Sequence, residues 1–403
     1  MRITREFEIG MKIYDSDWFL KYELGYQDAA RCLRDWGITF VLAQSRLLPM
    51  PDSAVESEAP PELADRYAIY DDRRFRDALA REGIEYWATV CMFFDPKALV
   101  ADPSLRPVGS DGRPMQKVDW YIGIPPSMDG FVSQKTAAIE RAVRELEPEG
   151  VFLSFTRWPG FWELWMPHHT RRDFPEYSYD LHTLDRFVRE TGVNLPTRDP
   201  TEAASWIEVH AREAWTSWKC QIVVDVVRQV KEACHRIRPG IQIMLNTLPF
   251  GAGDFEGAQE EVFGQRIEAL ADVVDVFEVM TYHQILKRPT SWFSSIGEEV
   301  KNRAGRKTVC TLQARPLYLD GIYAKDNRSP TLDAEEFAEA VSAVENSSVD
   351  GIVVFVWSDL LEEVLKQNDM RRVDAIRAAA ERPRLYEKRI HNSYGDTHMI
   401  VAL

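Results

Sequence analysis

Short apolar runs rich in β-branched residues alternate with segments of helical period along the whole 403-residue chain. The expected strands are 10–16, 38–44, 84–93, 150–156, 241–247, 274–282, 306–313 and 351–357. The expected helices are 24–36, 70–82, 132–147, 203–237, 257–271, 292–304, 332–347 and 370–382. Strict alternation predicts a parallel sheet. Eight such units favour a closed (β/α)8 barrel, and no glycine-rich phosphate loop follows the first strand to support a doubly wound sheet.

The loops that follow the strands are unequal in length. Long segments follow strand two (45–69), strand three (94–130) and strand four (157–200), whereas the loops leading into strands are short. Barrel active sites form at the carboxyl ends of the strands, so long loops on one face predict a deep, covered pocket there. No linker or internal repeat interrupts the pattern. The sequence therefore predicts one barrel domain over 1–403, with a C-terminal extension at about 383–403.

The composition of the chain limits the kinds of binding partner that it can have. Forty-nine basic and 64 acidic residues give a net charge of −15, which disfavours nucleic acid as a partner. The sequence contains no run of about 18 apolar residues, so it predicts no membrane span. The N-terminal residues lack the apolar core of a signal peptide. The five cysteines are odd in number and lack zinc spacing. We expect a cytoplasmic protein with no membrane partner; a homo-oligomer remains open.

Two strand ends resemble a known family. Strand six ends in Met280-x-Tyr282-His283, and strand eight ends in Trp357-Ser358-Asp359. These segments resemble strands six and eight of the chitinase-type (family 18) glycoside hydrolase barrels, which carry Met-x-Tyr-Asp and a terminal Trp. Arg157-Trp158-Pro159-Gly160 after strand four is also similar to a broad group of putative glycoside hydrolase barrels of undefined activity. The resemblance covers roughly residues 150–360 and implies a carbohydrate substrate.

Strand four departs from the family pattern. Chitinase-type barrels carry Asp-Gly-x-Asp-x-Asp-x-Glu there, with the last Glu as catalytic acid. In this chain the last three acidic positions fall on Phe152, Ser154 and Thr156. The general acid of that family is therefore absent, and the resemblance does not extend to substrate-assisted chitin hydrolysis.

Three carboxylates are the catalytic candidates. In the family register Glu278 points into the barrel with Met280 and Tyr282, where desolvation would raise its pKa and suit it to general acid catalysis. The alternative is a structural Glu278 paired with an inward Arg or Lys. Asp15 and Asp17 end strand one on a shared face, where they could activate water or orient a sugar hydroxyl; Asp17 could equally cap the next segment.

Further residues at strand ends or in the long loops are candidate substrate contacts. Aromatic rings suit the apolar faces of sugars, and polar groups suit their hydroxyls. The candidates are Trp120, Arg157, Trp158, Trp162, Glu163, Asn246, Tyr282, His283, Gln313, Arg315 and Trp357. Arg157 and Arg315 could bind an acidic sugar through bidentate contacts, or could neutralise the carboxylates of the site.

No metal or cofactor is expected. His168, His169 and His283 do not fall in a His-x-His or His-Glu-x-x-His pattern. The sequence predicts a glycoside hydrolase that uses carboxylate acid/base catalysis at the carboxyl face of the barrel. The alternatives are a hydrolase of an acidic sugar, such as a sialoside or uronide, and a non-catalytic carbohydrate-binding barrel. Sugar identity, linkage, stereochemistry and exo or endo action stay open.

Overall fold

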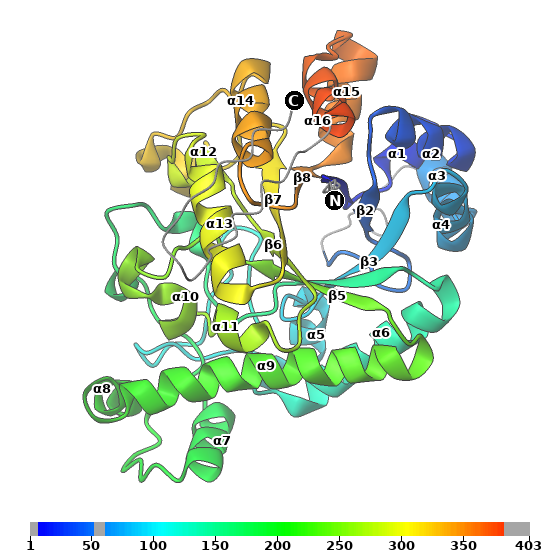
Figure 1. Ribbon diagram of the computed structural model, residues 1–403. Helices are drawn as coiled ribbons and strands as arrows, with labels where there is room; N and C mark the ends of the chain where they lie inside the picture. The colour runs from blue at the N-terminus through cyan, green and yellow to red at the C-terminus, as the bar shows by residue number, and fades with distance from the viewer. Residues whose placement is uncertain (1–6, 52–60, 383–403) are drawn as a thin grey trace, which may run out of the picture.

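The computed structural model describes residues 7–51 and 61–382, so the expected C-terminal extension at 383–403 lies outside the described residues. All eight strands pair in parallel and close on themselves in chain order, β1 to β8 (Figure 1). The strands are β1 (Glu8–Ile13), β2 (Phe40–Ala43), β3 (Glu85–Cys91), β4 (Gly150–Ser154), β5 (Gln242–Thr247), β6 (Val276–Val279), β7 (Lys307–Gln313) and β8 (Gly351–Phe355). The predicted (β/α)8 barrel is confirmed.

Helices surround the barrel in the predicted order. The main ones are α2 (Tyr26–Asp35), α4 (Asp72–Arg81), α6 (Asp129–Leu146), α8 (Pro200–His210), α9 (Arg212–Ile237), α13 (Trp292–Ala304), α14 (Ala334–Glu345), α15 (Trp357–Gln367) and α16 (Arg371–Glu381). The expected helix 203–237 is two helices, α8 and α9, because the backbone at Ala211 leaves helical geometry, with φ at −143°. The long α9 crosses one side of the barrel (Figure 1).

The expected helix 257–271 is also interrupted, and only its ends are helical, as α10 (Ala258–Glu261) and α11 (Ile267–Leu270). Gly264 lies between them with φ at +68°, a conformation that suits glycine. A Cβ at Gly264 would stand 2.5 Å from the ring of Trp158, so the interruption also makes room for the loop after β4.

Short helices lie within the connections. They are α1 (Asp17–Leu20), α3 (Pro61–Ala68), α5 (Pro96–Ala101), α7 (Leu181–Thr191), α12 (His283–Leu286) and the 3-10 helices η2 (Pro103–Leu105), η3 (Trp162–Leu164), η4 (Arg171–Asp173), η5 (Asp254–Glu256) and η6 (Gly321–Asp326). The long loops after β3 and β4 are therefore partly ordered as α5, η2, η3, η4 and α7.

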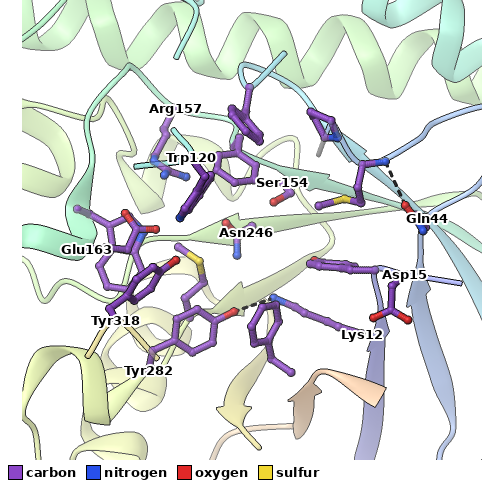
Figure 2. A pocket seen from close by; sticks show the side chains of 18 of the residues that line it. Lys12, Asp15, Gln44, Trp120, Ser154, Arg157, Glu163, Asn246, Tyr282 and Tyr318 are labelled. Carbon is purple, nitrogen blue, oxygen red and sulfur yellow. Dashed lines mark hydrogen bonds between the residues drawn. The ribbon is translucent and has the colours of Figure 1, made fainter. Parts of the chain in front are cut away.

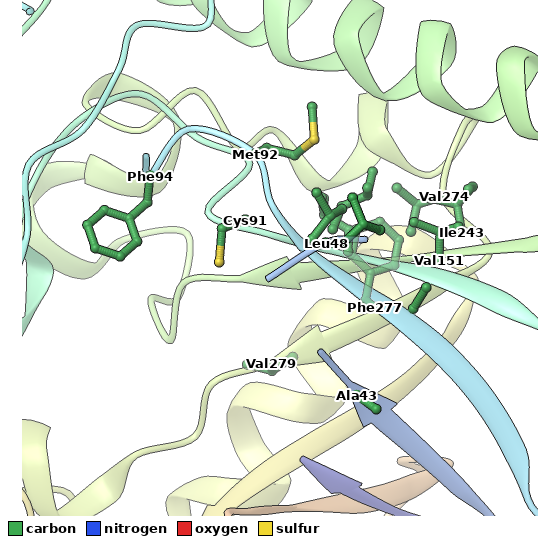
Figure 3. Close-up of a cluster of buried hydrophobic side chains, with 14 of the residues drawn as sticks. Ala43, Leu48, Cys91, Met92, Phe94, Val151, Ile243, Val274, Phe277 and Val279 are labelled. Atoms are coloured by element: carbon green, nitrogen blue, oxygen red, sulfur yellow. The ribbon is translucent and has the colours of Figure 1, made fainter. Parts of the chain in front are cut away.

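The strands carry two sets of buried side chains. Since successive strand residues point to opposite faces, one set fills the barrel and the other packs under the helices. The interior set is Phe40, Leu42, Trp87, Phe152, Met244, Val276, Val309 and Val353. Figure 3 shows part of the outer set, including Ala43, Val151, Ile243, Phe277 and Val279. The apolar interior closes the barrel below the carboxyl ends of the strands.

Strand ends differ from the sequence expectation where the site begins. β1 stops at Ile13 and β6 at Val279, so Asp15, Asp17 and Tyr282 lie just beyond the sheet. Asp17 is the first residue of α1. None of the helices within the described ranges is long and apolar enough to cross a membrane.

Candidate active site

A pocket of about 470 Å³ opens at the carboxyl end of the barrel, a size usual for small-molecule sites. Its wall combines β1 and the segment after it, the loops after β2, β3, β4 and β7, and the ends of β5, β6 and β8. The lining side chains include Lys12, Tyr14, Asp15, Asp17, Phe94, Trp120, Phe155, Arg157, Trp162, Glu163, Asn246, Met280, Tyr282, Tyr318 and Phe355 (Figure 2). The expected pocket therefore exists on the expected face.

A buried ion pair supports the floor of the pocket. The Nζ atom of Lys12 lies 3.0 Å from Oε1 of Glu278, and the side chains are 2% and 0% exposed. Asn246, which is the register partner of Glu278 on the adjacent strand, donates its side-chain N–H to Oε2. Lys12 also donates to the Tyr282 hydroxyl at 3.4 Å. Burial lowers the pKa of Lys12, while Glu278 opposes that shift.

This geometry corrects the expectation for Glu278. From the sequence we expected Glu278 to point into the barrel with Met280 and Tyr282 and to act as a general acid whose pKa is raised by desolvation. In the structure Glu278 does not line the pocket, and its carboxylate is bound by Lys12 and Asn246, which do line it. The alternative reading, a structural Glu paired with an inward lysine, describes what is observed.

Asp15 is held on one wall of the pocket. The Ser358 hydroxyl donates to Oδ2 of Asp15 at 2.7 Å, and the backbone N–H of Asp17 donates to Oδ1 at 3.0 Å. Burial raises the pKa of Asp15, and the hydrogen bond from Ser358 works against that shift. Asp17 is half-buried and also lines the pocket. Both carboxylates from the segment after strand one thus reach the pocket, as expected.

Glu163 occupies the opposite wall (Figure 2). It lies in η3, is 4% exposed, and its Oε2 atom has no hydrogen-bond partner within the described residues. Burial raises the pKa of Glu163 to about 7, although Arg157 and Arg328 lower it. A buried carboxyl that holds a proton near neutrality is what a general acid requires.

Aromatic rings surround the space between these walls. Trp120, from the loop after β3, and Trp162, from the loop after β4, both line the pocket. The Trp162 ring lies 6.1 Å from that of Tyr282, and the Trp120 ring lies 5.9 Å from that of Phe155. Such surfaces suit the apolar face of a sugar ring.

Two expected aromatic contacts lie elsewhere. Trp158 is fully buried, packs on Trp218 with ring centroids 5.6 Å apart, and donates its indole N–H to the Lys219 carbonyl at 3.0 Å. Trp357 begins α15 and packs on Trp18, 5.8 Å between centroids. Both rings fill core space and neither lines the pocket. The sequence could not separate them from Trp162, because tryptophan serves both roles.

Three polar candidates also lie outside the lining. Arg315 is 62% exposed, and its Nε lies 2.9 Å from Asp359. His283 pairs with Glu336 at 2.8 Å, and burial lowers the pKa of His283. Gln313 donates to Gln284 and to the Arg315 carbonyl, both at 3.3 Å. These side chains join β7 and the segment after it to α12 and α15, and α12 to α14.

Sequence reasoning missed several lining residues. Lys12 carried a signal that could have been used, since a lysine inside an apolar strand must find a buried partner. Tyr14, Phe155 and Phe355 also line the pocket, and aromatic residues at strand ends carry no pattern that separates pocket from core. Tyr318 comes from the loop after β7 and has φ at +56°, which no sequence signal indicated.

Comparison with known proteins shows which solved structures share this fold. No protein-family model matches the chain, and no curated protein matches it in sequence. Among solved structures, the glycoside hydrolase domain of PgaB (BpsB) from Bordetella bronchiseptica is similar, with a TM-score of 0.62 and 14% identity, covering 92% of this chain and 99% of that one.

Larger enzymes are also similar. A catalytic mutant of Gan42B, a GH42 β-galactosidase from G. stearothermophilus, has a TM-score of 0.59 and 10% identity, covering 94% of this chain and 58% of that one. The α-L-fucosidase isoenzyme 2 from Paenibacillus thiaminolyticus has a TM-score of 0.56 and 12% identity, covering 93% of this chain and 49% of that one. The chain thus has the (β/α)8 fold found in glycoside hydrolases, while family 18 in particular stays a resemblance.

In the part of the chain that the structure describes, no group of three or more His, Cys, Asp or Glu side chains is placed to hold a metal ion.

Proposed function

We propose that the protein is a glycoside hydrolase in which Glu163 is the general acid and Asp15 is its partner carboxylate. The observation that carries this proposal is the carboxyl of Glu163, buried on the pocket wall with a pKa of about 7. At neutral pH a large fraction of Glu163 holds a proton, and burial without a competing partner for Oε2 leaves that proton free to be donated.

The pocket supplies the other requirements of glycoside hydrolysis. Glycosidases place a carboxyl group on each side of the scissile bond, and Figure 2 shows Glu163 and Asp15 on opposite sides of the cavity. Glu163 would protonate the leaving oxygen. Asp15 would either attack the anomeric carbon or activate a water, and its two hydrogen bonds fix the orientation that either role needs. Trp120 and Trp162 would hold the sugar ring.

The Lys12–Glu278 ion pair below the pocket keeps the side chains of the pocket floor in place for this mechanism. A sugar bound between the two walls would rest on Asn246, Tyr282 and Lys12. Glu278 holds Asn246 and Lys12, and Lys12 in turn donates to the Tyr282 hydroxyl. Donors that are already fixed in place lose little energy to rearrangement when substrate binds. In this proposal Glu278 is a positioning residue.

The test is turnover by wild-type protein, Glu163→Gln and Asp15→Asn on a panel of unactivated disaccharides and activated aryl glycosides. Loss of general acid catalysis typically costs about 10²–10⁴-fold, so Glu163→Gln should lose that much on unactivated substrates and less on aryl glycosides. The anomer released first, followed by proton NMR, assigns retention or inversion. Sugar binding without turnover on any substrate would favour the non-catalytic binding barrel instead.

A further inference from the structure

The guanidinium of Arg157 is a buried charge that has no hydrogen-bond or ion-pair partner among the described residues. Arg157 follows β4, is 2% exposed and lines the pocket. Its Nε atom is buried without a hydrogen bond, and its side chain forms no ion pair with any residue of 7–51 or 61–382. The guanidinium lies over the rings of Phe155 and Tyr121, 5.0 Å and 5.9 Å from their centroids.

This state differs from that of other buried arginines in the chain. Arg372 lies 2.8 Å from Glu363, and Arg328 lies 3.4 Å from Asp326. Burying a charge is costly unless the charge is paired and hydrogen-bonded. Arg157 therefore stands out as a group that is satisfied when an anion enters the pocket.

Glu163 is close enough to influence Arg157 but does not neutralise it. The pKa of Glu163 stands at about 7 because burial outweighs the attraction of Arg157. Near neutrality the carboxyl is therefore protonated for much of the time, and no ion pair joins the two side chains. The positive charge of Arg157 is left available to a ligand.

We propose that Arg157 binds a carboxylate on the sugar itself, so that the substrate class is glycosides of uronic-type acids, and that this contact holds Glu163 in its acid form. The inference rests on the proposed function, which gives Glu163 its role. A carboxylate matches the planar fork of one guanidinium. A phosphate dianion would require more positive charge, and the second basic residue of the pocket lining, Lys12, is already paired with Glu278.

The coupling has a definite sign. A ligand carboxylate on Arg157 cancels the charge that lowers the pKa of Glu163 and adds a negative charge nearby, so the pKa of Glu163 should rise further. By linkage, protonated Glu163 favours binding of the anion, and binding takes up a proton near pH 7. Affinity for a uronate should therefore fall as pH rises through about 7.

Other charged and titratable groups around Glu163 do not produce this dependence. They are Arg328, Asp119, Tyr121, Tyr282, Tyr318 and Tyr323. The pKa of each of these four tyrosines is raised, chiefly by burial, so they stay neutral across the range. Arg328 stays paired with Asp326. Of Glu163 and these four tyrosines, Glu163 is the group whose charge changes near pH 7.

Calorimetric binding of free sugars to the full chain tests the first half of the proposal. The probes are glucuronate and galacturonate against glucose and galactose, with glucose 6-phosphate as a second anion. A uronate should bind at least about 30-fold more tightly than its neutral counterpart, and Arg157→Gln should remove that advantage. Arg157→Lys, which keeps the charge but loses the fork, should retain part of it. Arg315→Gln is the matched control, because Arg315 is exposed and paired outside the pocket.

Equal binding of uronates and neutral sugars by the wild-type protein would overturn the inference without any variant. Tighter binding of glucose 6-phosphate than of either uronate would overturn the assignment to a carboxylate. A preference for uronates that survives Arg157→Gln would place the anion elsewhere.

The same titrations at pH 5.5, 7 and 8.5, in buffers of different ionisation enthalpy, test the coupling. Uronate binding should take up protons near pH 7, and Glu163→Gln should abolish both the uptake and the loss of affinity at high pH. A pH-independent affinity would overturn the coupling. A failure of the proposed function would look different: uronates would bind in an Arg157-dependent way, but no uronide would be hydrolysed. Hydrolysis of neutral glycosides that requires Glu163 but not Arg157 would overturn the present inference and leave the proposed function intact.

Discussion

The Nζ atom of Lys12 on β1 lies 3.0 Å from Oε1 of Glu278 on β6, inside the barrel and above a layer of apolar side chains. Neither side chain is more than 2% exposed. Each charge is tolerated there because the other is present, since an isolated buried ion is strongly unfavourable. The pair connects strands one and six directly below the pocket.

Removing one member of this pair should cost more than removing both. We expect Lys12→Met or Glu278→Gln alone to lower the free energy of unfolding by roughly 3–5 kcal/mol, the usual result of leaving a buried charge unpaired. The Lys12→Met/Glu278→Gln double variant should lose clearly less than the sum. Urea unfolding of the four proteins measures the coupling; additive losses would mean that the two charges do not depend on each other.

The raised pKa of Glu163 predicts a pH-dependent stability. Because the folded protein holds this proton more tightly than the unfolded chain, the stabilising contribution is fully present below about pH 4.5 and is lost as pH rises through about 7. Glu163→Gln removes this dependence. Relative to wild type, the variant should therefore gain up to roughly 3 kcal/mol between pH 4 and pH 8. Unfolding free energies across that range provide the measurement, and a constant difference would contradict the raised pKa.

The fold was predictable because it depends on patterns that sequence carries directly. Alternating strand and helix periods fixed the number and order of the elements, and the long loops after β3 and β4 indicated the face of the pocket. Helix interruptions were less visible. The break at Ala211 has no glycine or proline to mark it, and Gly264 was hidden inside an apparently continuous pattern, since its role depends on contact with Trp158.

The site was predictable only in part, because a residue's partners decide its role. Asp15 and Asp17 reach the pocket because they end a strand, which sequence can indicate. Glu278 occupied the expected register, yet its carboxylate forms an ion pair with Lys12, which lies far away in the chain on β1. From the sequence, Glu163 was expected as a substrate contact. Its distinction is that Oε2 is buried with no hydrogen-bond partner among the described residues, a state that only the folded loop creates.

Two tryptophans, one from the loop after β3 and one from the loop after β4, should respond differently to truncation. Trp120 is half-buried on the pocket wall, whereas Trp158 lies in the core against Trp218. Trp158→Ala should lower the free energy of unfolding by roughly 3–5 kcal/mol and leave sugar affinity of the folded protein unchanged. Trp120→Ala should weaken sugar binding with a smaller loss of stability. Paired measurements of urea unfolding and calorimetric binding decide this, and a sugar-binding defect confined to Trp158→Ala would reverse the assignment.

The hydrogen bond from Ser358 to Asp15 gives a last, more specific prediction. Donation by Ser358 at 2.7 Å lowers the pKa of Asp15, against the larger effect of burial, which raises it. Ser358→Ala removes the donor, so the pKa of Asp15 should rise further. If Asp15 must be ionised for catalysis, the acidic limb of the activity profile should move to higher pH by roughly one unit, since a hydrogen bond to a charged group contributes about 1.5–3 kcal/mol. Turnover on the plateau should change little, because Asp15 keeps its bond from the backbone of Asp17. Profiles of kcat/KM for wild type and Ser358→Ala, with Ser294→Ala on the exposed α13 surface as control, provide the comparison. An unmoved acidic limb would exclude Asp15 as the ionised carboxylate and direct attention to Asp17.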